Sequence, residues 1–163
     1  MRTRAGLFHG PGAPFELAEV ELDEPGPHDV VVRMAAVGVC GTDLHSWRGE
    51  WRRPTPMVLG HEGAGVVEAV GAEVRSVAPG DEVVLSWAPS CQACPDCAAG
   101  RPARCVPLQR AIGAGTLVDG STGIARDGET VYRGTATGAL AERVVVDERV
   151  ALPTGGGLSL IHI

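Results

Sequence analysis

The sequence lacks lysine, has few aromatic residues and contains no long apolar run. All 14 basic residues of the 163-residue chain are arginine; with 20 acidic residues, the formal net charge is -6. Such a charge repels nucleic-acid phosphates and anionic lipid, so we expect no nucleic-acid partner and no membrane partner. No stretch approaches the roughly 20 apolar residues of a membrane helix, and no signal-peptide core follows the first residues. We therefore expect a cytoplasmic protein.

Apolar residues make up 44% and charged residues 21% of the chain, a composition that excludes a disordered protein and fits one domain. Short β-branched and alternating stretches lie between proline and glycine turns, a pattern typical of strands. Strands are expected at 15–22, 29–39, 63–70, 82–86 and 139–146, with a weaker one at 5–8. One short helix is expected from 41 to about 48, capped by Thr42 or Asp43. The fold class is therefore mainly β, a barrel or sandwich whose loops carry the chemistry.

The five cysteines are unevenly spaced, and four of them fall within fifteen residues. The cluster consists of Cys91, Cys94, Cys97 and Cys105. Four thiolates at this spacing can close a tetrahedron around Zn²⁺ and leave no open position, which indicates a structural zinc. Free thiols, two disulfides and an iron–sulfur cluster are the alternatives, although the seven-residue gap before Cys105 departs from the ferredoxin pattern.

A second group of possible metal ligands lies earlier in the chain. Cys40 ends an expected strand, and His61 follows twenty-one residues later, next to Glu62. A thiolate and an imidazole from two separate turns can bind a zinc ion and leave room for a substrate oxygen. Spacing alone does not decide between this reading and an ordinary buried cysteine and histidine.

Three motifs together resemble one known family. They are Gly60-His61-Glu62-x2-Gly65-x5-Gly71-x2-Val74, Cys40-Gly41-Thr42-Asp43-Leu44-His45 and Pro79-Gly80-Asp81-Glu82-Val83. With the cysteine cluster, their order and spacing resemble zinc-containing alcohol dehydrogenases of the medium-chain dehydrogenase/reductase superfamily. The segments at 115–120 and 134–142 are similar to the liver-type and formaldehyde-dehydrogenase-like branch.

This resemblance implies a GroES-like β-barrel catalytic domain, with short helices and a zinc-binding lobe, normally followed by a Rossmann domain that binds NAD(P). We expect that domain at 1–157, its structural zinc lobe at 89–107 and a non-native tail at 158–163, with the Rossmann domain absent. The implied full-length protein is a homo-oligomer with two zinc ions per subunit. It oxidises a small-molecule alcohol to an aldehyde or ketone by hydride transfer to NAD(P). The present piece alone is expected to be inactive.

The resemblance also assigns a role to individual residues. Cys40 and His61 would hold the catalytic zinc, with Glu62 beside it, and the four clustered cysteines the structural zinc. Asp43 would fix the orientation of His61. Thr42 would accept the substrate hydroxyl proton and His45 would pass it to solvent. Trp87 and Trp51 would line the substrate pocket, although core packing is an equal alternative for Trp51.

Two features depart from the family pattern. The third protein ligand of the catalytic zinc would fall beyond Pro153, where nothing matches, and Gly41 replaces a basic residue that often contacts coenzyme phosphate. Two other functions therefore stay open. One is a non-catalytic zinc-binding GroES-like module, and the other is a cysteine-cluster redox or iron–sulfur protein.

Overall fold

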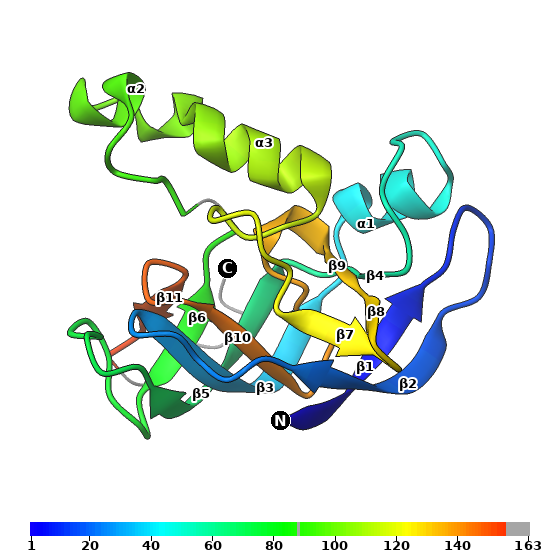
Figure 1. The fold of residues 1–163 in the computed structure, drawn as a ribbon, viewed down its shortest axis with the longest axis horizontal. Coiled ribbons are helices and arrows are strands. Elements are labelled where there is room, and N and C mark those ends of the chain that lie inside the picture. The colour runs from blue at the N-terminus through cyan, green and yellow to red at the C-terminus, as the bar shows by residue number, and fades with distance from the viewer. Residues whose placement is uncertain (88, 156–163) are drawn as a thin grey trace.

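The computed structural model describes residues 1–87 and 89–155, and Figure 1 shows their path. The predicted tail at 158–163 lies outside the described residues. Two sheets form most of the fold. The first has the strand order β8-β7-β2-β1-β4-β9 and the second β10-β3-β5-β6-β11. No helix among the described residues is long and apolar enough to cross a membrane.

The first sheet consists of β1 (Arg2–Phe8), β2 (Glu16–Leu22), β4 (Met57–Val58), β7 (Ile124–Arg126), β8 (Glu129–Thr130) and β9 (Tyr132–Arg133). The second consists of β3 (Asp29–Gly38), β5 (Glu62–Val70), β6 (Glu82–Leu85), β10 (Arg143–Asp147) and β11 (Ala151–Pro153). An antiparallel bridge from Ala5 to Ala141 joins β1 to the segment before β10. Because this bridge connects the two sheets, they form a nearly closed barrel, as the sequence predicts.

The start of strand β3 is buried on both of its faces. Val30, Val31 and Val32 are inaccessible to solvent, and β10 and β5 pair with its two edges. Val30 and Val32 pack into one apolar cluster, whereas Val31 packs into another. A strand buried on both faces reads as a continuous apolar run, which explains the Val-Val-Val sequence at its start.

The predicted strands and the predicted helix are present, with shifted ends. Helix α1 covers Gly41–Trp47, and its N-cap is Cys40 rather than the expected Thr42 or Asp43. The strand expected at 139–146 begins only at Arg143. Before it, the backbone N–H groups of Ala139 and Leu140 bond to the carbonyls of Gly60 and Leu59 and pair with no strand. The short helices α2 (Pro95–Ala98), η1 (Pro102–Arg104), α3 (Val106–Ala114) and η2 (Gly134–Ala136) were not expected. Figure 1 shows α2 and α3 along one side of the barrel.

A buried arginine ties one loop to the barrel wall. Arg133 is inaccessible to solvent, and burial lowers the pKa of its guanidinium to about 10. Its Nη1 donates to the carbonyls of Thr137 and Val145, at 3.0 and 2.9 Å, and its Nε donates to the carbonyl of Thr122. These bonds hold the turn that contains η2, which contributes Thr135 to the cleft described below.

The carboxylate of Glu148 fastens another loop to the barrel. It accepts hydrogen bonds from the backbone N–H of Arg75 at 3.1 Å and from the hydroxyl of Ser76 at 2.9 Å. The backbone N–H of Arg75, followed by the Ser76 hydroxyl and His28, lowers the pKa of Glu148 to about 2, against the opposite effect of burial. A lowered pKa in the folded state means that the ionised carboxylate stabilises the fold.

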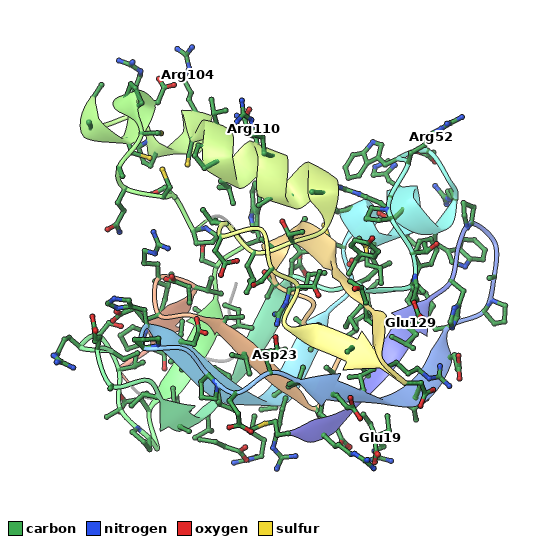
Figure 2. All side chains as sticks on the ribbon, viewed as in Figure 1. Glu19, Asp23, Arg52, Arg104, Arg110 and Glu129 are labelled. Carbon is green, nitrogen blue, oxygen red and sulfur yellow. The ribbon has the colours of Figure 1, made fainter. Side chains whose placement is uncertain are left out.

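We expect Glu148→Gln to lower the free energy of unfolding by about 1 kcal/mol at neutral pH, because charge-assisted hydrogen bonds are lost. The contribution of Glu148 is complete above the ordinary glutamate pKa of about 4.5 and disappears as pH falls towards 2. Urea denaturation of both proteins across this range should therefore show the difference shrinking with acid. Glu129→Gln, at the exposed position labelled in Figure 2, should behave like the unchanged protein at every pH. A Glu148 difference independent of pH would contradict the prediction.

Candidate metal centres and active-site cleft

The first candidate site begins at the N-terminus of α1. Cys40 precedes the helix, and its backbone N–H donates to Oδ2 of Asp43 at 3.0 Å. The other oxygen of Asp43 accepts from the backbone N–H of Gly60 at 3.1 Å. One buried carboxylate thus joins the helix that carries Cys40 to the turn that carries His61.

The turn before His61 requires glycine. Gly60 has φ of +88°, and a Cβ there would lie 2.8 Å from the backbone nitrogen of Leu140. Its carbonyl accepts from Ala139, so the turn is held from both sides. Glycine alone fits both the left-handed backbone and the close approach.

His61 is buried, and its Nδ1 lies 3.7 Å from Oδ1 of Asp43 with no hydrogen-bond partner in the structure. Asp43 raises the pKa of His61, against burial, and contact with Cys40 adds to the increase. Burial raises the pKa of Asp43, but His61 and the N–H groups of Cys40 and Gly60 outweigh it, so the net pKa is lowered. Because Asp43 faces Nδ1, the Nε2 atom is the nitrogen left for a metal.

Glu62 completes the group. Its carboxylate, the sulfur of Cys40 and a ring nitrogen of His61 all lie within 4.8 Å of one another. The backbone N–H and the hydroxyl of Thr42, with His61, lower the pKa of Cys40. A thiol that ionises readily, an imidazole and a carboxylate are a donor set that suits Zn²⁺. The residues present therefore fit a metal ion.

Sequence reasoning missed the glycine that makes room for Glu62. Gly38 is the partner of Glu62 between β3 and β5, and a Cβ at Gly38 would lie 2.4 Å from Oε2 of Glu62. The sequence does show a glycine two residues before Cys40, at position 38. That this glycine must lack a side chain follows only from its pairing with Glu62 on the neighbouring strand.

These residues line a cleft of about 750 Å³. Its walls contain Gly38, Cys40, Thr42, Trp51, Arg53, His61, Glu62, Gly63, Val84, Leu85, Trp87, Ile112 and Thr135. Both predicted pocket tryptophans are among them, and both are half exposed. Thr42 has its hydroxyl 3.6 Å from the sulfur of Cys40. The structure thus brings together in one cleft most of the residues that the sequence singled out.

Asp43 and His45 do not line the cleft: Asp43 is buried beside His61, and His45 lies at the exposed side of α1. The ring of His45 stacks on that of Trp51, with centroids 5.0 Å apart and planes at 29°, and its Nδ1 contacts the carboxylate of Glu50. Trp51 therefore both lines the cleft and packs against His45. The Trp51 ring lines the cleft, and His45 packs against that ring at the exposed side of α1.

The second candidate site is the cysteine cluster between Pro89 and α3. The sulfurs of Cys91, Cys94, Cys97 and Cys105 all lie within 4.8 Å of one another. Figure 2 shows sulfur atoms gathered near α2 and the start of α3. Helix α3 holds this lobe on the barrel, because Cys105 and Leu108 pack against Ala136 of η2. None of the five cysteines forms a disulfide.

The distances and charges in the cluster suit a single cation. Sulfur–sulfur distances are 3.5 Å from Cys94 to Cys97 and 4.0 Å from Cys91 to Cys97, close to the ~3.8 Å of a tetrahedral zinc with 2.3 Å bonds. Backbone N–H groups of Ala93 and Cys94 lower the pKa of Cys91 to about 6. Burial and the neighbouring sulfurs raise the pKa of Cys97 to about 11. Cys91 ionises readily, but ionising the other three thiols next to it requires a nearby cation to offset the repulsion. The four residues therefore fit zinc.

A nearly closed barrel with a four-cysteine lobe and a Cys-His-Glu group in a cleft defines a domain with two candidate metal centres. Residues 26–155 match the model of the alcohol dehydrogenase GroES-like domain family. The chain therefore belongs to this family, and the predicted fold and resemblance are confirmed.

Known relatives agree with this assignment. The chain is 38% identical over 160 residues to the NDMA-dependent alcohol dehydrogenase of Amycolatopsis methanolica, covering 98% of this chain and 43% of that protein. It is 36% identical to the S-(hydroxymethyl)glutathione dehydrogenase of Escherichia coli, covering 91% of this chain and 40% of that protein. The crystal structure of an alcohol dehydrogenase zinc-binding domain protein from Burkholderia ambifaria superposes with a TM-score of 0.85 at 35% identity. That match covers 94% of this chain and 42% of the solved chain.

The chain thus spans less than half the length of these relatives. The expected domain limits at 1–157 and 89–107 stay predictions. The match to the alcohol dehydrogenase GroES-like domain family ends at residue 155, close to the expected end of the domain.

Proposed function

We propose that this chain is the catalytic domain of a zinc- and NAD(P)-dependent alcohol dehydrogenase that oxidises small alcohols to aldehydes or ketones. The observation that carries the proposal is the convergence of Cys40, His61 and Glu62 within 4.8 Å in a substrate-sized cleft. A non-catalytic GroES-like module would not need these three side chains in one cavity. In the full-length protein, a dinucleotide-binding domain would supply NAD(P).

In this proposal, Cys40 and His61 hold the catalytic metal, and Glu62 lies beside it. The zinc supplies a Lewis acid that makes the substrate hydroxyl more acidic, and NAD(P) supplies the hydride acceptor. The metal ligands gain their orientation from Asp43, which faces Nδ1 of His61 and holds the backbone of Cys40 and Gly60. Trp51 and Trp87 cover parts of the cleft wall and exclude water from the substrate.

The proton follows a short route along α1. Thr42 lines the cleft beside Cys40, so its hydroxyl can accept the substrate proton. His45 lies at the exposed side of the same helix, where an imidazole can pass a proton to solvent. His45 stacks on Trp51 and does not line the cleft, so the Thr42 hydroxyl and the His45 imidazole would be the two groups of this chain at the inner and outer ends of the route.

The four clustered cysteines hold a second, structural zinc in this proposal, for a total of two per subunit. Supporting observations are sulfur–sulfur distances close to those around a zinc ion and the packing of α3 on the barrel. We further propose a cytoplasmic location, supported by five unpaired cysteines, and a homo-oligomeric full-length protein.

Metal analysis tests the proposal directly. The chain alone should retain one tightly bound zinc in the cluster and a second, weaker one at Cys40 and His61, and should not reduce NAD(P) with alcohols. The full-length protein should contain two zinc ions and show alcohol-dependent NAD(P) reduction. Robust turnover by this chain alone, or a brown iron-containing product, would refute it.

Asp43→Asn should weaken metal binding at the Cys40–His61 site by about ten- to a hundredfold, the usual effect of losing a carboxylate that orients a histidine ligand. Asparagine keeps one oxygen that can accept from one of the two backbone N–H groups, whereas its amide nitrogen cannot accept from the other. Titration with Co²⁺, followed by its thiolate absorption, measures the affinity. Asp127→Asn, at an exposed position, is the matched control and should bind Co²⁺ normally. Equal affinities in the two variants would show that Asp43 has no such role.

A further inference from the structure

The turn that contains η2 lies against the four-cysteine lobe. Ala136, in η2, is inaccessible to solvent and packs against Cys105 and Leu108. Cys105 belongs to the cysteine cluster, and Leu108 is buried on α3 three residues later. The position of Ala136 therefore depends on how the lobe and α3 are folded.

The same turn lies against the residues that carry His61. A Cβ at Gly134 would lie 2.8 Å from the Cα atom of Leu59, so the two backbone segments are in direct contact. Just after the turn, the backbone N–H of Ala139 donates to the carbonyl of Gly60 at 2.9 Å. These contacts support the backbone on which His61 is placed.

The backbone of η2 is strained. Thr135 and Ala136 have φ of +49° and +58°, in the left-handed region that favours glycine, and a β-branched residue such as threonine is poorly suited to it. Among the described residues, the buried hydroxyl of Thr135 also finds no hydrogen-bond partner. Such a conformation persists only where neighbouring groups hold it in place.

Two contacts hold this turn, one from the barrel and one from the lobe. From the barrel, Nη1 of Arg133 donates to the carbonyl of Thr137 at 3.0 Å, which fixes the residue that follows η2. From the lobe, Leu108 packs on Ala136, a strained residue within η2. If the lobe unfolds, the turn can relax to an unstrained conformation, and the backbone that carries His61 loses its support.

We propose that the two metal centres are coupled through this turn, so that a metal ion in the lobe raises the metal affinity of the Cys40–His61 site. The lobe, folded around its ion, holds Ala136 in the strained conformation, and the turn then keeps His61 beside Cys40. Coupling between two sites is typically worth about five- to 150-fold in affinity, and here the strained turn is the element that both sites bias. This inference rests on the proposed function, because it assumes that both centres bind metal. It gives the lobe a part in assembling the catalytic site.

Titration of the chain with Co²⁺ measures this coupling. In the unchanged chain, one equivalent of Zn²⁺ first fills the lobe, and the thiolate absorption of Co²⁺ then reports the affinity of the Cys40–His61 site. The comparison is a variant in which the three half-buried cluster cysteines are replaced, Cys91→Ser, Cys94→Ser and Cys97→Ser. It cannot hold metal in the lobe, but Cys105 and its packing partners are unchanged. The Cys40–His61 site should bind Co²⁺ about ten- to a hundredfold more weakly in this variant.

Two further variants assign the coupling to the turn. Leu108→Ala removes a contact on Ala136 but no metal ligand, so it should weaken Co²⁺ binding at the Cys40–His61 site even when the lobe is filled. Thr135→Gly removes the strained side chain and its unpartnered hydroxyl, so the turn should no longer depend on the lobe. In the Thr135→Gly background, the affinities with a filled and an empty lobe should therefore be equal.

Leu22→Ala is the matched control, because Leu22 is a buried leucine in an apolar cluster of the barrel that does not include the lobe. It should keep the full difference between a filled and an empty lobe. Hydrogen exchange gives a second readout, since the N–H of Ala139 is bonded to Gly60. Protection of this amide should fall when the lobe is empty and in Leu108→Ala, but not in Leu22→Ala.

Equal Co²⁺ affinity of the Cys40–His61 site with the lobe filled and empty would overturn the inference. A difference that persists in Thr135→Gly, or one that Leu22→Ala abolishes, would also overturn it, because the η2 turn would then not carry the effect. If the Cys40–His61 site binds no Co²⁺ even in the unchanged chain with a filled lobe, the proposed function itself is contradicted, and this inference with it.

Discussion

In the full-length protein, if it has the proposed dehydrogenase activity, replacing His61 by alanine should reduce kcat/KM for alcohol oxidation by at least about ten-thousandfold, ~5.5 kcal/mol of lost transition-state stabilisation. The variant loses the imidazole that joins Cys40 and Glu62 in one group of ligands. It also leaves Asp43 buried without its cationic or metal-bound neighbour. The effect should fall on kcat, because the metal acts on the reacting oxygen.

Initial rates of NAD(P) reduction, together with zinc content, measure this loss. His61→Ala should contain one zinc per subunit instead of two. His9→Ala is the matched control, since His9 is an exposed histidine that contacts Glu16 on the surface. It should retain both metal and activity. Full activity of the His61 variant, or of a variant lacking both Cys40 and His61, would end the proposal of metal-assisted catalysis in this cleft.

Cys105→Ser should lower the affinity of the four-cysteine lobe for zinc at least a thousandfold, ~4 kcal/mol, so that the lobe loses its tightly bound metal. Cys105 is the only cluster cysteine that is fully buried, and it packs with Leu108 and Ala136 where α3 meets the barrel. Structural zinc contributes directly to folding, because the ligand geometry does not exist in the unfolded chain. Losing the ion should therefore unfold residues 89–107 while the barrel persists.

Zinc competition with a chromophoric chelator measures the affinity, and hydrogen exchange reports the local unfolding. Amide protection should disappear from the lobe and from α3 but remain at Val30, Val31 and Val32 of β3, which are buried in the barrel. Cys40→Ser is the matched control, because it removes a thiol from the other site and should leave the lobe zinc in place. Unchanged lobe protection in metal-free Cys105→Ser would show that the cluster is not a structural metal site.

Much of the barrel could be predicted because its strands carry local signals. The apolar runs and turn residues around 16–22, 29–38 and 62–70 mark these strands without reference to the rest of the chain. Strands β4 and β9, of two residues each, leave no periodicity to read. They form because Met57 and Val58 pair with both β1 and β9.

Helix α3 was missed for a related reason. Its nine residues begin next to a proline and end at Gly115, so the helical pattern is short. Its stability comes from Leu108 and Ala111, which are buried against the rest of the molecule. The segment at 139–142 gave the opposite error, because the N–H groups of Ala139 and Leu140 bond to the carbonyls of Gly60 and Leu59 and only Ala141 forms an isolated bridge to β1.

The sequence by itself determined which side chains are available for metal binding and, through the spacing of short motifs, the family to which the chain belongs. The cysteines of the lobe lie within fifteen residues, so one loop brings them together. Tertiary structure alone decided that His61 meets Cys40, that Gly38 leaves space for Glu62, and that Arg53 lines the same cleft. These contacts depend on strand pairing and on the packing of α1 and α3, which bring distant residues together in ways that local sequence patterns do not encode.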